Sequence, residues 1–135
     1  QDAVRLADSK AKIIAKACPL FVPLAEEGWV DDEIALSIAE RYLLEMSRDV
    51  KALILACTHY PLLKKVIAKV MGYDVRLVDP AEMMAREATK LLGQAKGSGT
   101  LRLCVTDVPR RFDEVAKRFL GGPLPDVEKV VVSKD

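Results

Sequence analysis

The sequence predicts an α/β fold with a largely parallel sheet and flanking helices. Short runs of β-forming residues alternate along the chain with segments of helical length, which is typical of such folds. The run at residues 51–56 is apolar on both faces, as expected for a buried parallel strand. No internal repeat interrupts this alternation, and 135 residues match the ordinary size of one domain.

Before that apolar run, the chain is expected to form a strand, a loop and a helix. Residues 11–16 are predicted to be the strand, and residues 18–23 a loop, because their two prolines cannot continue either regular structure. Asp31 or Asp32 can accept hydrogen bonds from the first free amides of a helix over about 33–47. Apolar residues recur along that helix at one-face spacing, so it is expected to cover a sheet.

The alternation continues after the run at 51–56. A helix is expected from Pro61 to Gly72, since proline suits a first helical position and glycine a helix end. The remaining predicted elements are a strand at 75–78, a helix opened by Asp79 and Pro80 and ending near 92, a flexible segment at 93–99, a strand at 101–105, a helix at 109–120 and a strand at 127–132. The expected total is five strands and four helices.

Charge and cysteine content exclude several classes of function. The chain carries 21 Lys+Arg against 20 Asp+Glu, so it has no cationic excess for nucleic acid or an anionic membrane surface. Charged residues interrupt every apolar stretch before membrane-spanning length, so no membrane helix is expected. Three cysteines are too few for a disulfide framework, and none are paired at metal-ligand spacing. We therefore expect a reduced, cytoplasmic setting and no metal.

The turn after the run at 51–56 is the expected place for a site. It carries Cys57, Thr58 and His59, the last being the only histidine of the sequence. Ligands of open α/β sheets bind beyond the carboxyl ends of strands, and the predicted helix that follows would favour negative charge at its start. A thiol beside an imidazole can be a nucleophile or a general base. Both uses remain open from the residues alone, as does simple packing of the cysteine.

Three blocks of sequence resemble the C-terminal half of bacterial glutamate racemases, members of the aspartate/glutamate racemase family. They are ACPLFVPLAEEG at residues 17–28, ACTHYPLL at 56–63, and VTD at 105–107 followed by Arg111 and Phe112. Their order and spacing agree with the family over essentially the whole chain. The sequence departs from the pattern at Ala56, where the family usually has glycine, but no functional group is lost there.

The resemblance implies a cofactor-independent racemase that interconverts L- and D-glutamate for peptidoglycan synthesis, cell-wall biogenesis and maintenance of cell shape. Two cysteines would act on opposite faces of the substrate α-carbon, and Cys57 corresponds to the base that acts on L-glutamate. His59 would assist that thiol, and Thr58 would donate hydrogen bonds to a substrate carboxylate. Glu26 matches an acidic position of the family's site. Cys18 and Cys104 are expected only to pack.

The family's chain is longer and carries its first catalytic cysteine in a Cys-Asn-Thr block, which this sequence lacks. The chain opens on Gln1, and we expect that a preceding part is missing. Residues 1–79 would be most of the second domain, and residues 80–135 a segment that completes the first, giving an incomplete two-domain architecture. The isolated chain is then expected to be inactive, with apolar helix faces left exposed, and the full-length parent to be a homodimer.

Two alternatives remain open at this point. The parent could be a racemase of aspartate or another acidic amino acid, because the same two-cysteine layout recurs there. It could also be a non-catalytic α/β interaction module that keeps the Cys57 block for packing. The second alternative predicts that Cys57→Ala in the full-length parent leaves activity intact.

Overall fold

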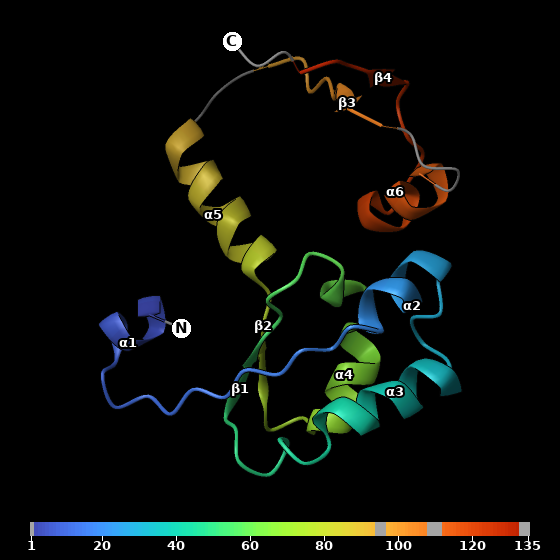
Figure 1. The fold of residues 1–135 in the computed structure, drawn as a ribbon. Helices are drawn as coiled ribbons and strands as arrows, with labels where there is room; N and C mark the ends of the chain where they lie inside the picture. The colour runs from blue at the N-terminus through green and yellow to red at the C-terminus, as the bar shows by residue number, and fades with distance from the viewer. Residues whose placement is uncertain (1, 94–96, 108–111, 133–135) are drawn as a thin grey trace.

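The computed structural model describes residues 2–93, 97–107 and 112–132 (Figure 1). Its elements are, in chain order, α1 (Asp2–Ala7), α2 (Phe21–Glu27), α3 (Glu33–Leu43), β1 (Ala52–Ile54), the 3₁₀ helix η1 (Tyr60–Leu63), α4 (Lys64–Met71), β2 (Arg76–Val78), α5 (Pro80–Leu92), β3 (Leu103–Val105), α6 (Phe112–Leu120) and β4 (Val127–Lys129). Strands and helices therefore alternate from β1 onward.

The strands form two separate parallel pairs. Strand β1 pairs with β2 in the register Leu53 to Leu77, and β3 pairs with β4 in the register Cys104 to Glu128. A helical connection separates the strands of each pair, as parallel pairing requires. The predicted α/β class with parallel strands is confirmed.

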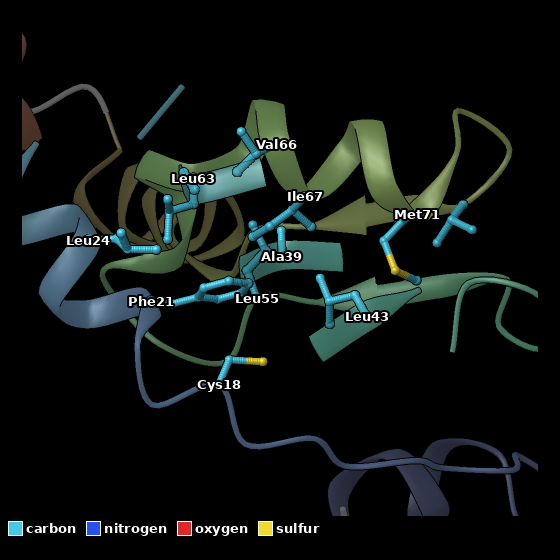
Figure 2. Packing of buried hydrophobic residues seen from close by; sticks show 12 residues of the cluster. Cys18, Phe21, Leu24, Ala39, Leu43, Leu55, Leu63, Val66, Ile67 and Met71 are labelled. Atoms are coloured by element: carbon cyan, nitrogen blue, oxygen red, sulfur yellow. The ribbon is translucent and has the colours of Figure 1, made fainter. Parts of the chain in front are cut away.

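The hydrophobic core is built by the first three-fifths of the chain. Helices α2, α3 and α4 enclose it beside β1, with Phe21, Leu63 and Ile67 as its largest fully buried side chains (Figure 2). Phe21 meets Tyr42 edge-on, with 5.4 Å between the ring centroids. Helices α5 and α6 contain no buried residue among those described. The core therefore fixes the position of the β1 end and of α2, where the candidate site lies.

Local capping signals were predicted well. The Asp32 side chain accepts a hydrogen bond of 2.8 Å from the Ala35 amide, so Asp32 caps α3. Asp79 caps α5 in the same way, with Pro80 at the first helical position. Helix α4 ends at Gly72, as expected. Helix α3 stops at Leu43, short of its predicted end at 47, and turns follow it.

Two predictions for the first part of the chain are wrong. Residues 11–16 form no strand, and the segment has no ladder hydrogen bonds to a neighbouring strand within the described residues. Helix α2 begins at Phe21, inside the loop predicted at 18–23, and includes Pro23. Proline is tolerated there because an amide in the first turn of a helix has no intrahelical acceptor.

The burial of β1 also differs from the prediction. Leu53 is half-buried and Leu55 is buried, but Ala52 and Ile54 on the alternate face are exposed, Ile54 by 48%. Because side chains alternate along a strand, the core lies on one face of β1 only. The prediction that both faces are covered is therefore wrong.

The remaining strands are shorter than predicted. Strand β3 begins at Leu103 and β4 ends at Lys129. The beginning of the helix predicted at 109–120 and part of the flexible segment at 93–99 lie outside the described residues.

Apolar side chains are exposed on α5 and α6, as expected. Met84 is 70% exposed and Leu91 89%, and Phe119 of α6 is 42% exposed. Among the described helices, none is both long and apolar enough to cross a bilayer.

Candidate active site

The candidate site begins where β1 ends. The Leu55 amide donates to the Val78 carbonyl at 3.0 Å, which carries the β1 to β2 pairing one residue past the strand. The chain then turns through Cys57, and the Tyr60 amide donates to the Cys57 carbonyl at 3.1 Å to start η1. Cys57 is thus held at the carboxyl end of a parallel strand, as predicted.

The helix after the turn differs from the prediction. A single four-residue turn of 3₁₀ helix, η1, precedes α4, so no α-helix starts at Pro61. Free amides at an α-helix N-terminus therefore do not follow Cys57 directly.

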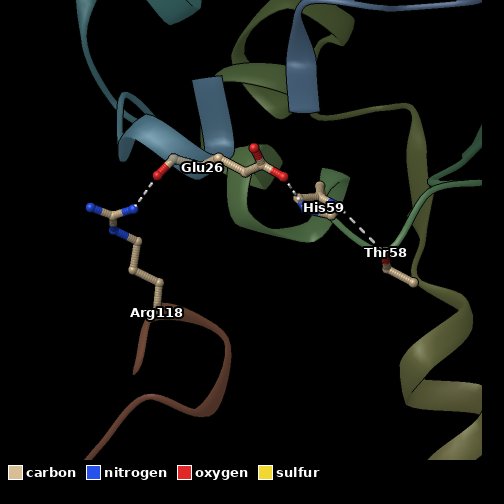
Figure 3. Close-up of polar contacts among 4 residues, drawn as sticks. All are labelled: Glu26, Thr58, His59 and Arg118. Atoms are coloured by element: carbon tan, nitrogen blue, oxygen red, sulfur yellow. Dashed lines mark hydrogen bonds and ion pairs between the residues drawn. The ribbon is translucent and has the colours of Figure 1, made fainter. Parts of the chain in front are cut away.

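His59 lies between two polar side chains. Its Nε2 is 3.4 Å from Oε1 of Glu26, and its Nδ1 is 3.3 Å from Oγ1 of Thr58 (Figure 3). The His59 side chain is 23% exposed and that of Glu26 is 54% exposed. The structure therefore brings together three of the four predicted site residues in one contact chain, and Cys57 lies two residues before His59 on the same turn.

The two partners of His59 determine which nitrogen of its neutral ring carries the proton. A carboxylate can only accept, so the neutral ring pairs with Glu26 when Nε2 carries its proton. Nδ1 is then an acceptor, to which the Thr58 hydroxyl donates. A protonated ring would instead donate from both nitrogens, with Glu26 balancing its charge. The pair therefore places an imidazole and a carboxylate beside the turn that carries Cys57.

Tyr60 ties the turn to the core. Its hydroxyl donates to the Cys18 carbonyl at 3.4 Å, and its ring meets Phe21 edge-on at 5.3 Å. Burial raises the pKa of Tyr60 above its ordinary value of 10.0, and Coulombic repulsion from Cys18 and Cys57 adds to that rise. Sequence reasoning missed this role of Tyr60, although the residue lies within the ACTHYPLL block.

The other two cysteines lie away from this contact chain. Cys18 packs in the core, as predicted, and burial raises the pKa of its thiol against a smaller opposing effect of Lys16. Cys104 is exposed on β3, so the prediction that it packs is wrong. Leu103 and Val105, on the other face of β3, are half-buried.

Helix α6 reaches the site from far along the chain. Arg118 Nη1 donates to the Glu26 carbonyl at 2.6 Å, and the Phe119 ring meets the His59 ring edge-on, with 5.3 Å between centroids. Sequence reasoning predicted the helix that carries these two residues but gave neither a role in the site. Nothing in the local pattern indicates a contact between residues 92 positions apart.

The comparisons with known proteins agree on one family. The chain is 44% identical over 135 residues to a glutamate racemase of Geobacter metallireducens, covering 95% of this chain and 50% of that protein. It is 42% identical over 138 residues to a glutamate racemase of Chlorobium phaeobacteroides, covering 97% and 51%. No protein-family model matches the chain.

Solved structures give the same result. A glutamate racemase from Francisella tularensis in complex with D-glutamate superposes with a TM-score of 0.80 at 34% identity, over 96% of this chain and 51% of that one. One from Thermus thermophilus in complex with β-chloro-D-alanine gives 0.77 at 44% identity, over 86% and 46%. Over nearly its whole length, the chain is similar to one half of each of these glutamate racemases. It spans about half the length of the curated relatives it matches.

The similarity to glutamate racemases confirms the resemblance seen in the sequence. It also agrees with the fold, because the two parallel sheets with their helices superpose on racemase structures over nearly the whole chain. The roles of Cys57, His59, Glu26 and Thr58 stay predictions.

Proposed function

We propose that the chain contributes one side of the active site of a glutamate racemase, in which Cys57 removes the α-proton of L-glutamate. The observation that carries the proposal is the strand-end turn with Cys57, Thr58 and His59, in which His59 pairs with Glu26 at 3.4 Å, in a chain similar to one half of a glutamate racemase. A structural relative whose complex contains D-glutamate supports the choice of substrate.

The proposed chemistry needs only proton transfers. The Cys57 thiolate takes the α-proton, and the electron pair of the broken C–H bond stays on the α-carbon, delocalised into the adjacent carboxyl group. A second acid on the opposite face then gives a proton to that carbon, which inverts it. Neither step changes an oxidation state, so no cofactor is required.

The neighbours of Cys57 have supporting roles in this proposal. The Thr58 hydroxyl, which is exposed on the turn, donates to a substrate carboxylate when it does not donate to His59. The Glu26–His59 pair holds a proton near the Cys57 thiol. It thereby restores the protonation state of that thiol between turnovers. His59 would act on Cys57 from two residues away on the same turn.

The second acid of the proposed reaction is a further thiol that this sequence does not supply. Cys18 is buried and Cys104 lies on β3, and the family resemblance gives neither a catalytic role. We therefore propose that the 135 residues alone are inactive. Residues 1–79 would be most of one domain and residues 80–135 the completing segment of another, in a cytoplasmic homodimer that supplies D-glutamate for peptidoglycan.

A hybrid enzyme tests the proposal. In the Geobacter metallireducens glutamate racemase, the half that aligns with this chain is replaced by the chain itself, giving a protein called the hybrid racemase below. We expect it to form D-glutamate from L-glutamate, and Cys57→Ala to reduce turnover by at least about 10³-fold, because a lone thiol base is lost. Cys104→Ala, the matched control at an exposed position, should retain activity.

Two results would contradict the proposal. A folded hybrid racemase without activity would show that the chain cannot supply its side of the site. Equal activity of the Cys57→Ala and Cys104→Ala hybrids would favour the non-catalytic module. If the large hybrid does not fold, a smaller hybrid in which only residues 51–72 are exchanged tests the same proposal. Assays of the active hybrid with glutamate, aspartate and other acidic amino acids determine which of them is the substrate.

A further inference from the structure

Helix α6 contacts both members of the Glu26–His59 pair, although it lies far from them in sequence. Arg118 reaches the backbone of Glu26, and Phe119 lies against the ring of His59. Figure 3 shows Arg118 approaching Glu26 from the side opposite His59. Two adjacent residues of one helix therefore contact the two members of the Glu26–His59 pair.

The Arg118 contact fixes the end of α2. The last carbonyls of a helix have no intrahelical donor, and the Glu26 carbonyl belongs to this last turn of α2. The Arg118 guanidinium satisfies it at 2.6 Å, and a cation at a helix C-terminus is also favoured by the helix dipole. Gly28 makes room, since a Cβ atom there would lie 2.6 Å from Nη2 of Arg118.

The Phe119 contact fixes the plane of the imidazole. The two rings are nearly perpendicular, at 89°, which is a favourable edge-to-face geometry. A ring held in this plane directs Nε2 toward Glu26 and Nδ1 toward Thr58. Because the Glu26 carboxylate is more than half exposed, its contact with His59 would be weak without such orientation.

We propose that α6 positions the Glu26–His59 pair for the racemase reaction, with Arg118 and Phe119 as positioning residues. This inference rests on the function proposed above. This role of α6 was not predicted from the sequence. Arg118 and Phe119 touch no reacting atom and act through Glu26 and His59.

The first measurement uses the chain as it is. His59 is the sole histidine of the sequence, so its ring ¹⁵N signals can be identified without ambiguity. Glu26→Gln should change those signals, and the size of the change reports the coupling of the pair. We expect Phe119→Leu or Arg118→Gln to reduce this change at least about twofold, as in a double-mutant cycle. Phe119→Tyr, which keeps an aromatic ring, should preserve the full change in the ¹⁵N signals. Lys117→Gln on the same helix should also leave that change unaltered.

The second measurement uses the hybrid racemase. Phe119→Leu and Arg118→Gln should each lower kcat about tenfold with little change in KM, because misplaced groups cost more in the transition state than in binding. Phe119→Tyr should keep kcat near that of the unaltered hybrid racemase, and Lys117→Gln should not lower it. Leucine keeps the apolar volume at position 119, so the comparison with tyrosine isolates the ring contact.

The outcomes separate this inference from the proposed function. A coupling in the isolated chain that does not depend on Phe119 and Arg118 overturns the inference. So does an active hybrid racemase whose kcat is the same in all four variants. An inactive, folded hybrid together with an α6-dependent coupling overturns the proposed function, while the positioning of the pair by α6 stands.

Discussion

Nε2 of His59 lies 3.4 Å from Oε1 of Glu26, which joins the turn after β1 to the last turn of α2. These two residues are 33 positions apart in sequence. The core residue Phe21, at the start of α2, packs against Tyr60, the neighbour of His59, and so holds the two segments together. The Glu26–His59 pair is thus positioned by the same packing that forms the core.

Removing the charge of Glu26 should slow the hybrid racemase. In Glu26→Gln the amide can no longer balance an imidazolium, so we expect kcat to fall about tenfold, less than in Cys57→Ala. Steady-state racemisation kinetics measure the effect. Glu45→Gln removes an equal charge from an exposed position beyond α3 and is the control. Equal rates for the two variants would show that the pair has no part in turnover.

The cap of α3 should have a measurable effect on stability. Asp32→Ala removes the side-chain acceptor of the Ala35 amide, and loss of such a cap costs about 0.5–2 kcal/mol. Urea unfolding of the chain measures it. Asp31→Ala is the control, because Asp31 makes an exposed ion pair to Lys65 and should cost less. A larger loss for Asp31→Ala would contradict the assignment of Asp32 as the cap.

The sequence predicted best what local chemistry decides. Asp32, Pro80 and Gly72 mark helix ends because each acts on backbone groups within a few residues of itself. The strand-end position of Cys57 was also predictable, since it follows from one apolar run. No tertiary information was needed for these features.

The parts that sequence reasoning missed depend on tertiary contacts. Pro23 was interpreted as a helix breaker, but its position in the first turn of α2 removes the conflict with the helical hydrogen bonds. The exposed face of Ile54 depends on which side of β1 the helices cover, which the apolar run does not encode. The contact of Phe119 with His59 joins segments that no periodicity relates.

The free energy of unfolding should fall in alkaline solution. Burial raises the pKa of the Cys18 thiol above its ordinary value of 9.0 and that of Tyr60 above 10.0. The unfolded chain therefore ionises at lower pH than the folded one. This part of the stability is fully present below the unfolded pKa and is lost as pH rises through the folded pKa.

Urea unfolding between about pH 8 and about pH 10.5 measures this loss. Cys18→Ala should flatten the decline, because one of the two acids with a raised pKa is removed. Cys104→Ala should not, since that side chain is exposed. A decline that is equally steep in all three proteins would exclude Cys18 as a source of the alkaline sensitivity.

Gly28 and Arg118 should be energetically coupled. Gly28 has a φ of 83°, which costs an L residue about 1–2 kcal/mol, so Gly28→Ala should destabilise the chain for that reason alone. The added Cβ would also displace the Arg118 guanidinium from the Glu26 carbonyl, at a further cost of about 0.5–1.5 kcal/mol for the lost hydrogen bond. Only this second part depends on Arg118. Gly28→Ala should therefore cost less in an Arg118→Ala background than in the unaltered chain, as measured by urea unfolding of the four proteins of the cycle. An equal cost in both backgrounds would show that the guanidinium does not hold the end of α2.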